Sequence, residues 1–261
     1  MEFFRAHGLG NDYLVWVATP DAAPPTPAQV RLVCDRHRGV GGDGVLVPVD
    51  APDGGYGVRI LNPDGSEAEK SGNGLRILAW WLHHRRGAPE SFAVWTRGGT
   101  VRCVVEGARV RVDMGRAIVG AVERRGAHAV IPVDVGNPHA VVRVDAEPSR
   151  ADWHGAGAWL EQSVPGRTNV QFVWLQAGAV HARVWERGAG PTLASGSSAC
   201  AVAAALVAQG AVASPVTVRM EGGDLHVDVH ADGSVRLEGP VAPVGSVRLD
   251  PGFAATLAAY P

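Results

Sequence analysis

The hydrophobic positions of the chain fall mainly into short segments that are rich in β-branched side chains and bounded by Gly, Pro, Asp or Asn. Segments of this kind are typical of β-strands in a folded domain. We therefore expect strands at residues 13–17, 45–49, 56–61, 101–105, 108–112, 129–133, 140–144, 170–175, 179–185, 216–220, 225–229 and 234–238.

Four other segments have the end signals or the periodicity of helices. Thr26-Pro27 combines an N-cap residue with proline at the first helical position, which predicts a helix that runs to about His37 and ends before Gly39. Further helices are expected at 72–86, closed by Gly87, at 151–162, and at 196–209, closed by Gly210. Many strands with a few interspersed helices predict an α/β architecture of the mixed α+β kind.

The two halves of the chain resemble each other when the sequence is shifted by 124 positions. The shift aligns Arg59 with Arg183, Ser71 with Ser195, Gly72 with Gly196, Ala79 with Ala203, and Leu82 with Leu206. In each copy a strand is followed by a turn, a Ser-Gly pair and a helix that ends near a glycine. This agreement predicts an internal duplication, with two pseudo-symmetric domains that face one another across a cleft.

The Ser-Gly pairs lie where each expected helix begins. The first turn of a helix offers unpaired backbone N–H groups and the positive end of the helix dipole, which suit a bound carboxylate. Side chains at two such helix starts would lie on opposite sides of the ligand, which is the geometry for moving a proton from one face of a carbon to the other. One serine alone is a common N-cap, but the pair favours the functional interpretation.

Composition excludes several other classes of protein. With 261 residues, 46% hydrophobic and 19% charged, the sequence is that of an ordinary folded protein, and its net charge of −2 gives no reason to expect a nucleic-acid or membrane partner. Cys34, Cys103 and Cys200 are widely spaced, which argues against a disulfide scaffold or a zinc site, and no metal is expected. The N-terminus lacks the order of a signal peptide and no apolar run reaches about 20 residues, so we expect a cytoplasmic location.

Several motifs resemble those of the diaminopimelate epimerase family, in the order of that family and over essentially the whole chain. They are HGLGNDY at 7–13, NPDGS at 62–66 with SGNGLR at 71–76, GNPH at 136–139, RTN at 167–169, and ERGAG at 186–190 with TLASGS at 192–197. The resemblance implies an amino-acid epimerase without a cofactor, which interconverts LL- and meso-diaminopimelate on the route to lysine and peptidoglycan. It also implies a small-molecule amino-acid substrate and a homodimer.

The same resemblance implies a domain organisation. An N-terminal epimerase-like domain would comprise residues 1–116 and about 246–261, and a C-terminal one residues 117–245. The last strand of the chain would then return to the first domain, and the active site would lie in the cleft between the domains.

The resemblance assigns roles by motif. Ser71 and Ser195 would exchange the α-proton, and backbone N–H groups around Gly72-Asn73 and Gly196-Ser197 would hold the reacting carboxylate. The pocket would be lined by Asn11, Asn62, Asn137, Asn169, Glu186 and Arg187. The opposite charges of Glu186 and Arg187 suit the zwitterionic distal end of the ligand.

The sequence departs from the family at the two reacting positions, which are cysteine in the family and serine here. A thiol has a pKa of about 8.5 and a helix N-terminus lowers it to roughly 3.5–7.5, whereas a serine hydroxyl starts far above this range. General acid–base groups typically contribute on the order of 10²–10⁴ in rate. We therefore expect the fold and ligand binding to be kept and turnover to be low or lost.

Three interpretations of the two serines remain open. The chain is a substituted epimerase, engineered or natural; or its serines act with a nearby acid such as Glu69 or Asp43; or it racemises a related amino acid. A fourth interpretation, from another class, is a non-catalytic protein that binds an amino acid. Cys200, within the alanine-rich helix, is expected to be a core residue and not a substitute base.

Overall fold

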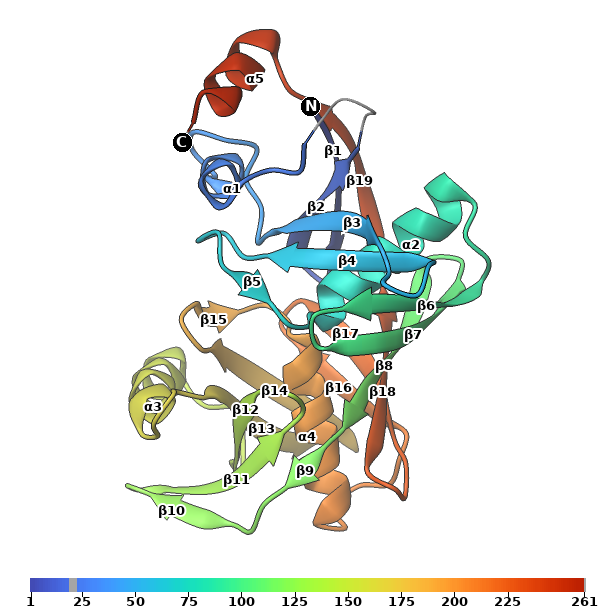
Figure 1. Cartoon of the computed structure of the whole chain (residues 1–261). Helices are drawn as coiled ribbons and strands as arrows, with labels where there is room; N and C mark the ends of the chain where they lie inside the picture. Colours follow the sequence, from blue (N-terminus) through green and yellow to red (C-terminus); the bar gives the residue numbers. More distant parts are fainter. Residues whose placement is uncertain (19–22, 261) are drawn as a thin grey trace. The chain divides into compact units, whose positions relative to one another are not determined.

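The structure is a computed structural model, which describes residues 1–18 and 23–260 (Figure 1). The chain divides into two compact units, of which unit 1 comprises residues 1–110 and 240–261 and unit 2 residues 111–239. The sequence predicted divisions near 116 and 245. Because β8 (Arg109–Arg116) pairs with β18 (Ser234–Pro240), most of β8 belongs with unit 2, which moves both divisions toward the N-terminus.

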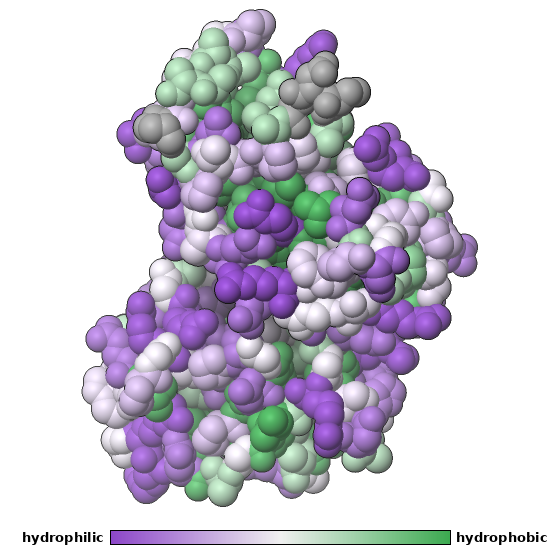
Figure 2. All heavy atoms as spheres, in the orientation of Figure 1, coloured by the Kyte–Doolittle hydropathy of each residue, from purple (hydrophilic) through white to green (hydrophobic). Residues whose placement is uncertain are grey.

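Unit 1 is built from two separate parts of the chain. The first part contains β1 (Glu2–Gly8), β2 (Asn11–Val17), α1 (Pro27–Cys34), β3 (Val45–Asp50), β4 (Tyr56–Leu61), β5 (Glu67–Ala68), α2 (Gly72–Arg86), β6 (Ser91–Thr96) and β7 (Gly99–Glu106). The second part adds β19 (Ala242–Arg248), which pairs antiparallel with β1, and α5 (Pro251–Ala258), which lies against α1. Apolar side chains gather on the surface at α5, where only Leu257 is buried (Figure 2).

Unit 2 repeats the order of unit 1. After β8 it contains β9 (Ile118–Val119), β10 (Glu123–Arg125), β11 (His128–Asp134), β12 (Pro138–Arg143), α3 (Arg150–Gln162), β13 (Asn169–Gln176), β14 (Ala179–Glu186), β15 (Gly190–Thr192), α4 (Gly196–Ala208), β16 (Val216–Met220), β17 (Gly223–Val229) and β18. Helix α4 contacts β9, β11, β12, β13, β16 and β17, so the strands of this unit surround it. Among the described residues, no helix is long and apolar enough to cross a membrane.

The strand register around α2 and α4 confirms the internal repeat. In unit 1, β4 pairs with β5 through Ile60↔Ala68 and with β6, in parallel, through Tyr56↔Val94. Adding 124 to these numbers gives the observed pairs in unit 2, Val184↔Thr192 between β14 and β15 and Val180↔Val218 between β14 and β16. Because the strands on both sides of each helix keep the same register, the two Ser-Gly pairs occupy equivalent places in the two units.

The other sequence predictions are mostly confirmed, and one is wrong. All twelve expected strands are present with ends shifted by a few residues, and α2, α3 and α4 match their expected ranges to within one residue. The first helix ends at Cys34 and not near His37, because the Asp35 carboxylate accepts hydrogen bonds from the N–H groups of His37 at 2.8 Å and Arg38 at 2.9 Å. These bonds turn the chain before Gly39. Strands β1, β5, β6, β9, β10 and β15 and helix α5 were not predicted, and β19 was expected without a residue range, as the last strand that returns to the first domain.

Candidate active site

Helix α2 begins at Ser71, whose hydroxyl has two partners. Its backbone is extended, with φ −142° and ψ 120°, and Oγ accepts a hydrogen bond from the Gly74 N–H at 3.0 Å. The hydroxyl of Tyr13, on β2, lies 3.2 Å from the same oxygen. Ser71 therefore caps the helix and shares a polar contact with a phenol that the sequence did not identify. Neither Glu69 nor Asp43, the acids suggested as helpers, bonds to this hydroxyl among the described residues.

A line of hydrogen bonds joins the first turn of α2 to the hairpin of β1 and β2. The guanidinium of Arg76, which is fully buried, donates to Asn73 Oδ1. The amide of Asn73 then donates to Asn11 Oδ1 at 2.8 Å, and the amide of Asn11 donates to Asp43 Oδ2 at 2.9 Å. Arginine can only donate and an ionised carboxylate can only accept, so the two ends fix the orientation of both amides.

Four charged groups lie at the Asp43 end of this line. Arg36 bridges Asp12 and Asp43, at 2.7 Å to each, and Arg5 also pairs with Asp12. Burial alone raises the pKa of Asp12, but hydrogen bonds from Arg36 and Arg5 outweigh it and hold this pKa below its usual value. Burial raises the pKa of Asp43, and the Asp12 charge adds to the rise against the hydrogen bonds from the Asp12 N–H and Arg36. Through Asp43, this cluster of charged groups holds the side chain of Asn11 in place.

Asn62, the remaining pocket residue expected in unit 1, is placed by its own turn. Its side chain donates to Ser66 Oγ at 2.9 Å, and its backbone N–H bonds to the Ser66 carbonyl at 2.8 Å. The structure therefore links Asn11, Ser71, Gly72 and Asn73 through α2 and β2, whereas Asn62 lies at the end of β4 without a hydrogen bond to that group among the described residues.

Helix α4 of unit 2 begins at Ser195, which is 6% exposed. Its backbone angles, φ −145° and ψ 127°, are close to those of Ser71, but its side chain does not cap the helix. The hydroxyl lies 3.5 Å from Ser197 Oγ, and the Ser195 N–H points to the Met220 sulfur at 3.4 Å. The Ser195 hydroxyl therefore does not accept a hydrogen bond from the N–H groups of the first turn of α4.

A buried polar chain connects α4 to Asn137. The amide nitrogen of Gln171 lies 2.9 Å from both Ser198 Oγ and His139 Nδ1, and His139 Nε2 lies 2.9 Å from Asn137 Oδ1. With the Gln171 amide as donor, Nδ1 accepts and Nε2 carries the proton that Asn137 receives as a hydrogen bond. Complete burial lowers the pKa of His139 to about 3, with the Arg187 charge adding to the shift and the Gln171 contact opposing it. This imidazole is neutral near pH 7 and orients Asn137.

The residues expected to hold the distal end of the ligand meet where β13 begins and β14 ends. Asn169 Oδ1 accepts from the Arg187 N–H at 3.0 Å, and its amide donates to the Pro138 carbonyl at 3.0 Å. Glu186 is half-buried at the end of β14, and Arg187 is exposed. Asn137, Asn169, Glu186 and Arg187 thus lie on neighbouring strand ends of one unit.

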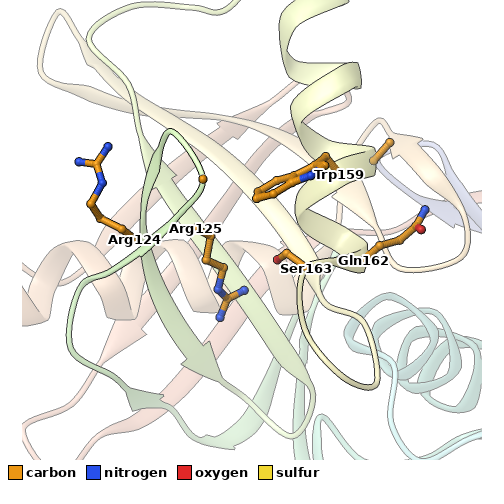
Figure 3. Close-up of a pocket in the computed structure, with 7 residues that line it drawn as sticks. Arg124, Arg125, Trp159, Gln162 and Ser163 are labelled. Carbon is orange, nitrogen blue, oxygen red and sulfur yellow. The ribbon is translucent and has the colours of Figure 1, made fainter.

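A cavity lies beside the C-terminal end of α3 in unit 2. About 670 Å³ in volume, it opens between the turn after β10 and the end of α3, where Arg124, Arg125, Trp159, Gln162 and Ser163 line it (Figure 3). None of the residues expected to bind substrate lines this cavity. In the described part of the chain no group of His, Cys, Asp and Glu side chains is arranged to hold a metal ion.

Comparison with known proteins decides the family. A family model for diaminopimelate epimerase matches residues 3–119 and 131–243. The diaminopimelate epimerase of Desulforudis audaxviator is 40% identical, over 94% of this chain and 97% of that protein. The chain belongs to the diaminopimelate epimerase family.

A second relative agrees with this assignment, and solved structures show the same fold. Diaminopimelate epimerase 2 of a Nostoc species is 37% identical, over 89% of this chain and 90% of its own length. Among solved structures, a predicted epimerase from Pseudomonas aeruginosa has a TM-score of 0.71 at 22% identity and covers 95% of this chain and 98% of its own. A hydroxyproline epimerase from Agrobacterium vitis, solved with trans-4-hydroxy-L-proline, has a TM-score of 0.74 at 18% identity and covers 96% of this chain and 93% of its own. These two structures share the fold.

Proposed function

We propose that the chain binds diaminopimelate and that Ser71 and Ser195 occupy the two positions from which a proton leaves and returns to the α-carbon. One observation carries the proposal. The register of the strands around α2 and α4 repeats at an offset of 124 residues, and each helix begins at a serine with nearly the same backbone angles. Membership of the diaminopimelate epimerase family supports the substrate.

The proposed reaction needs no group beyond the side chains and helix starts. Backbone N–H groups at Gly72-Asn73 and at Gly196-Ser197 would hold the α-carboxylate and stabilise negative charge that develops when the α-proton leaves. One serine, as its alkoxide, would take this proton and become a hydroxyl, while the other hydroxyl would give a proton to the opposite face and be left as the alkoxide. The proposal requires that one ligand reaches both helix starts.

The remaining pocket residues would choose the ligand. Asn11 and Asn62 of unit 1 and Asn137 and Asn169 of unit 2 offer amide donors and acceptors, and Glu186 and Arg187 offer one charge of each sign to the distal ammonium and carboxylate. We also propose that the protein acts as a cytoplasmic homodimer, for which light scattering on the purified chain would measure the mass.

Slow or absent turnover is expected, because a serine hydroxyl is a poor base near neutral pH. The test is the exchange of solvent deuterium into Cα of diaminopimelate, followed by NMR for the native chain and for the Ser71→Cys/Ser195→Cys double variant. We expect exchange with epimerisation in the double variant, at a rate at least 10²-fold above the native chain. Each single variant serves as a control, because a two-base reaction needs both groups.

Binding is measured in parallel with 2-aminoheptanoate, which has the same carbon chain but one amino-acid end. If neither the native chain nor the double variant prefers diaminopimelate over this compound, the substrate assignment is wrong. If both prefer it and the double variant shows no exchange, the assignment of the two reacting positions is wrong.

A second function is favoured by the contacts of Ser71. Its oxygen already accepts the Gly74 N–H, which makes it a structural cap as well as a candidate base. A chain that binds diaminopimelate without any exchange, and gains exchange with the two cysteines, is a binding protein built on an epimerase fold.

A further inference from the structure

Glu161 is a buried carboxylate in the last turn of α3. It is 4% exposed, although negative charge is unfavourable near a helix C-terminus and a buried charge is costly unless it is well paired. Oε2 accepts from the Trp185 indole N–H at 2.7 Å, and Oε1 accepts from the Gly188 N–H at 2.7 Å and from the Arg167 guanidinium. Burial raises the pKa of Glu161, but these hydrogen bonds and the Arg167 charge outweigh it and lower the pKa.

The partners of Glu161 lie next to the expected distal-end residues. Gly188 follows Arg187, and the N–H of Thr168, which precedes Asn169, bonds to the Glu161 carbonyl at 3.0 Å. Because the Arg187 N–H also bonds to Asn169 Oδ1, both segments are tied to Glu161 and to each other. The closed set of contacts fixes Asn169 and Arg187 relative to one another.

Two backbone features allow the contacts of Glu161, an unfavourable conformation at Arg167 and a glycine at position 157. Arg167 has φ +62°, a left-handed conformation that is uncommon outside glycine, and its side chain is held by Glu161. A Cβ at Gly157, one turn earlier on α3, would lie 3.0 Å from the Trp185 side chain, so glycine lets the indole lie against the helix. In that position its N–H reaches Glu161.

We propose that Glu161 is a positioning residue that holds Asn169 and Arg187 in place for the distal amino-acid end of the ligand. Glu161 itself does not touch the ligand; it acts through the segments 167–169 and 186–188. It thereby sets the preference for a ligand with two amino-acid ends over one with a single end. This inference rests on the proposed function of the same pocket.

The test compares the affinities of diaminopimelate and 2-aminoheptanoate by calorimetry. In Glu161→Gln the amide keeps the side-chain shape, but it cannot accept from Trp185, Gly188 and Arg167 together. We expect the dissociation constant for diaminopimelate to rise on the order of tenfold, as for loss of a hydrogen bond to a charged group, and that for 2-aminoheptanoate to stay within about twofold. A general structural defect would weaken both ligands equally.

Two further variants keep the inference falsifiable. Trp185→Phe removes one donor to Glu161 while keeping an aromatic ring against α3, so it stands in if Glu161→Gln fails to fold, and a smaller loss of preference is expected. Glu123→Gln, at an exposed glutamate of the same unit, is the matched control and should change neither affinity. The inference is overturned if Glu161→Gln keeps the native preference for diaminopimelate over 2-aminoheptanoate. If Glu161→Gln does not fold, the same result in Trp185→Phe overturns it. A native chain without any preference overturns the proposed function instead.

Discussion

Ser71 and Ser195 begin their helices with backbone angles that agree within 7°, yet only the Ser71 side chain caps its helix. The Ser71 oxygen accepts from the Gly74 N–H at 3.0 Å and lies near the phenol of Tyr13. The Ser195 hydroxyl has Ser197 as its neighbour, at 3.5 Å. The two serines therefore share a backbone conformation but differ in role, because the Ser71 hydroxyl caps its helix and the Ser195 hydroxyl does not.

This difference predicts unequal effects of the same substitution. Ser71→Ala removes a helix cap and is expected to lower the free energy of unfolding by about 1 kcal/mol. Ser195→Ala removes no capping hydrogen bond and should change it by less than about 0.5 kcal/mol. Urea unfolding of the two variants and the native chain measures both values. Equal losses in the two variants would contradict the predicted difference between a capping and a non-capping serine.

Two glycines of α3 give a matched pair in one helix. At Gly155 a Cβ would meet no atom within 4 Å, so Gly155→Ala is expected to stabilise the protein by roughly 0.5–1 kcal/mol. In Gly157→Ala the new Cβ would lie 3.0 Å from the Trp185 side chain, so this variant should destabilise the protein by roughly 1–3 kcal/mol. Thermal unfolding gives the sign of each change. A stabilising Gly157→Ala would contradict the packing of Trp185 on α3.

The buried His139 predicts a loss of stability in acid. Its pKa is about 3 in the folded chain against an ordinary value of 6.5, so the unfolded state binds the proton more readily. The stabilising contribution is complete above pH 6.5 and is lost as the pH falls toward 3, with a slope approaching ~1.4 kcal/mol per pH unit. Unfolding free energies of the native chain and His139→Leu between pH 7 and pH 4 test this. The variant should show the shallower slope, and parallel curves would refute the prediction.

The native cysteines should be unreactive. Cys103 and Cys200 are fully buried, and burial, with the charges of Asp12 and Asp43, raises the pKa of Cys34 to about 12. Iodoacetamide at pH 8 should leave the folded native chain unmodified, as judged by its intact mass. Ser71→Cys places a thiol in a partly exposed position at a helix start and should add a single label. Labelling of the native chain would contradict the burial of its thiols.

The sequence was most informative where a local signal coincides with a boundary. Ser71 with Gly87 correctly marks both ends of α2, because the first is a cap and the second adopts the left-handed conformation at φ +74°. The same reasoning misplaced the end of α1, where the Asp35 side chain turns the chain before the glycine. Helix α5 was missed although Asp250-Pro251 is an N-cap signal, since its short alanine-rich sequence lacks a polar face.

The sequence predicted site residues only where they belong to a recognisable motif. The positions of Asn11 and Asn73 follow from such motifs, but the contacts that orient them do not. Asn73 on α2 bonds to Asn11 on β2, and Asp43 reaches Asn11 from the segment between α1 and β3, so both contacts join separate elements. Glu161 gave no signal. A single glutamate in an amphipathic helix predicts a solvated side chain, and its burial depends on the indole of Trp185 and the turn at Gly188.

The construction of unit 1 from two distant segments affects the order of events during synthesis. Residues 111–239 leave the ribosome before β19 exists, so unit 2 can complete its own strand pairs while β1 still lacks its partner from β19. An unpaired edge invites association with other chains. Until translation reaches the last strand, the nascent protein therefore carries one finished half and one open sheet edge, and a premature stop after residue 239 would leave that edge permanently exposed.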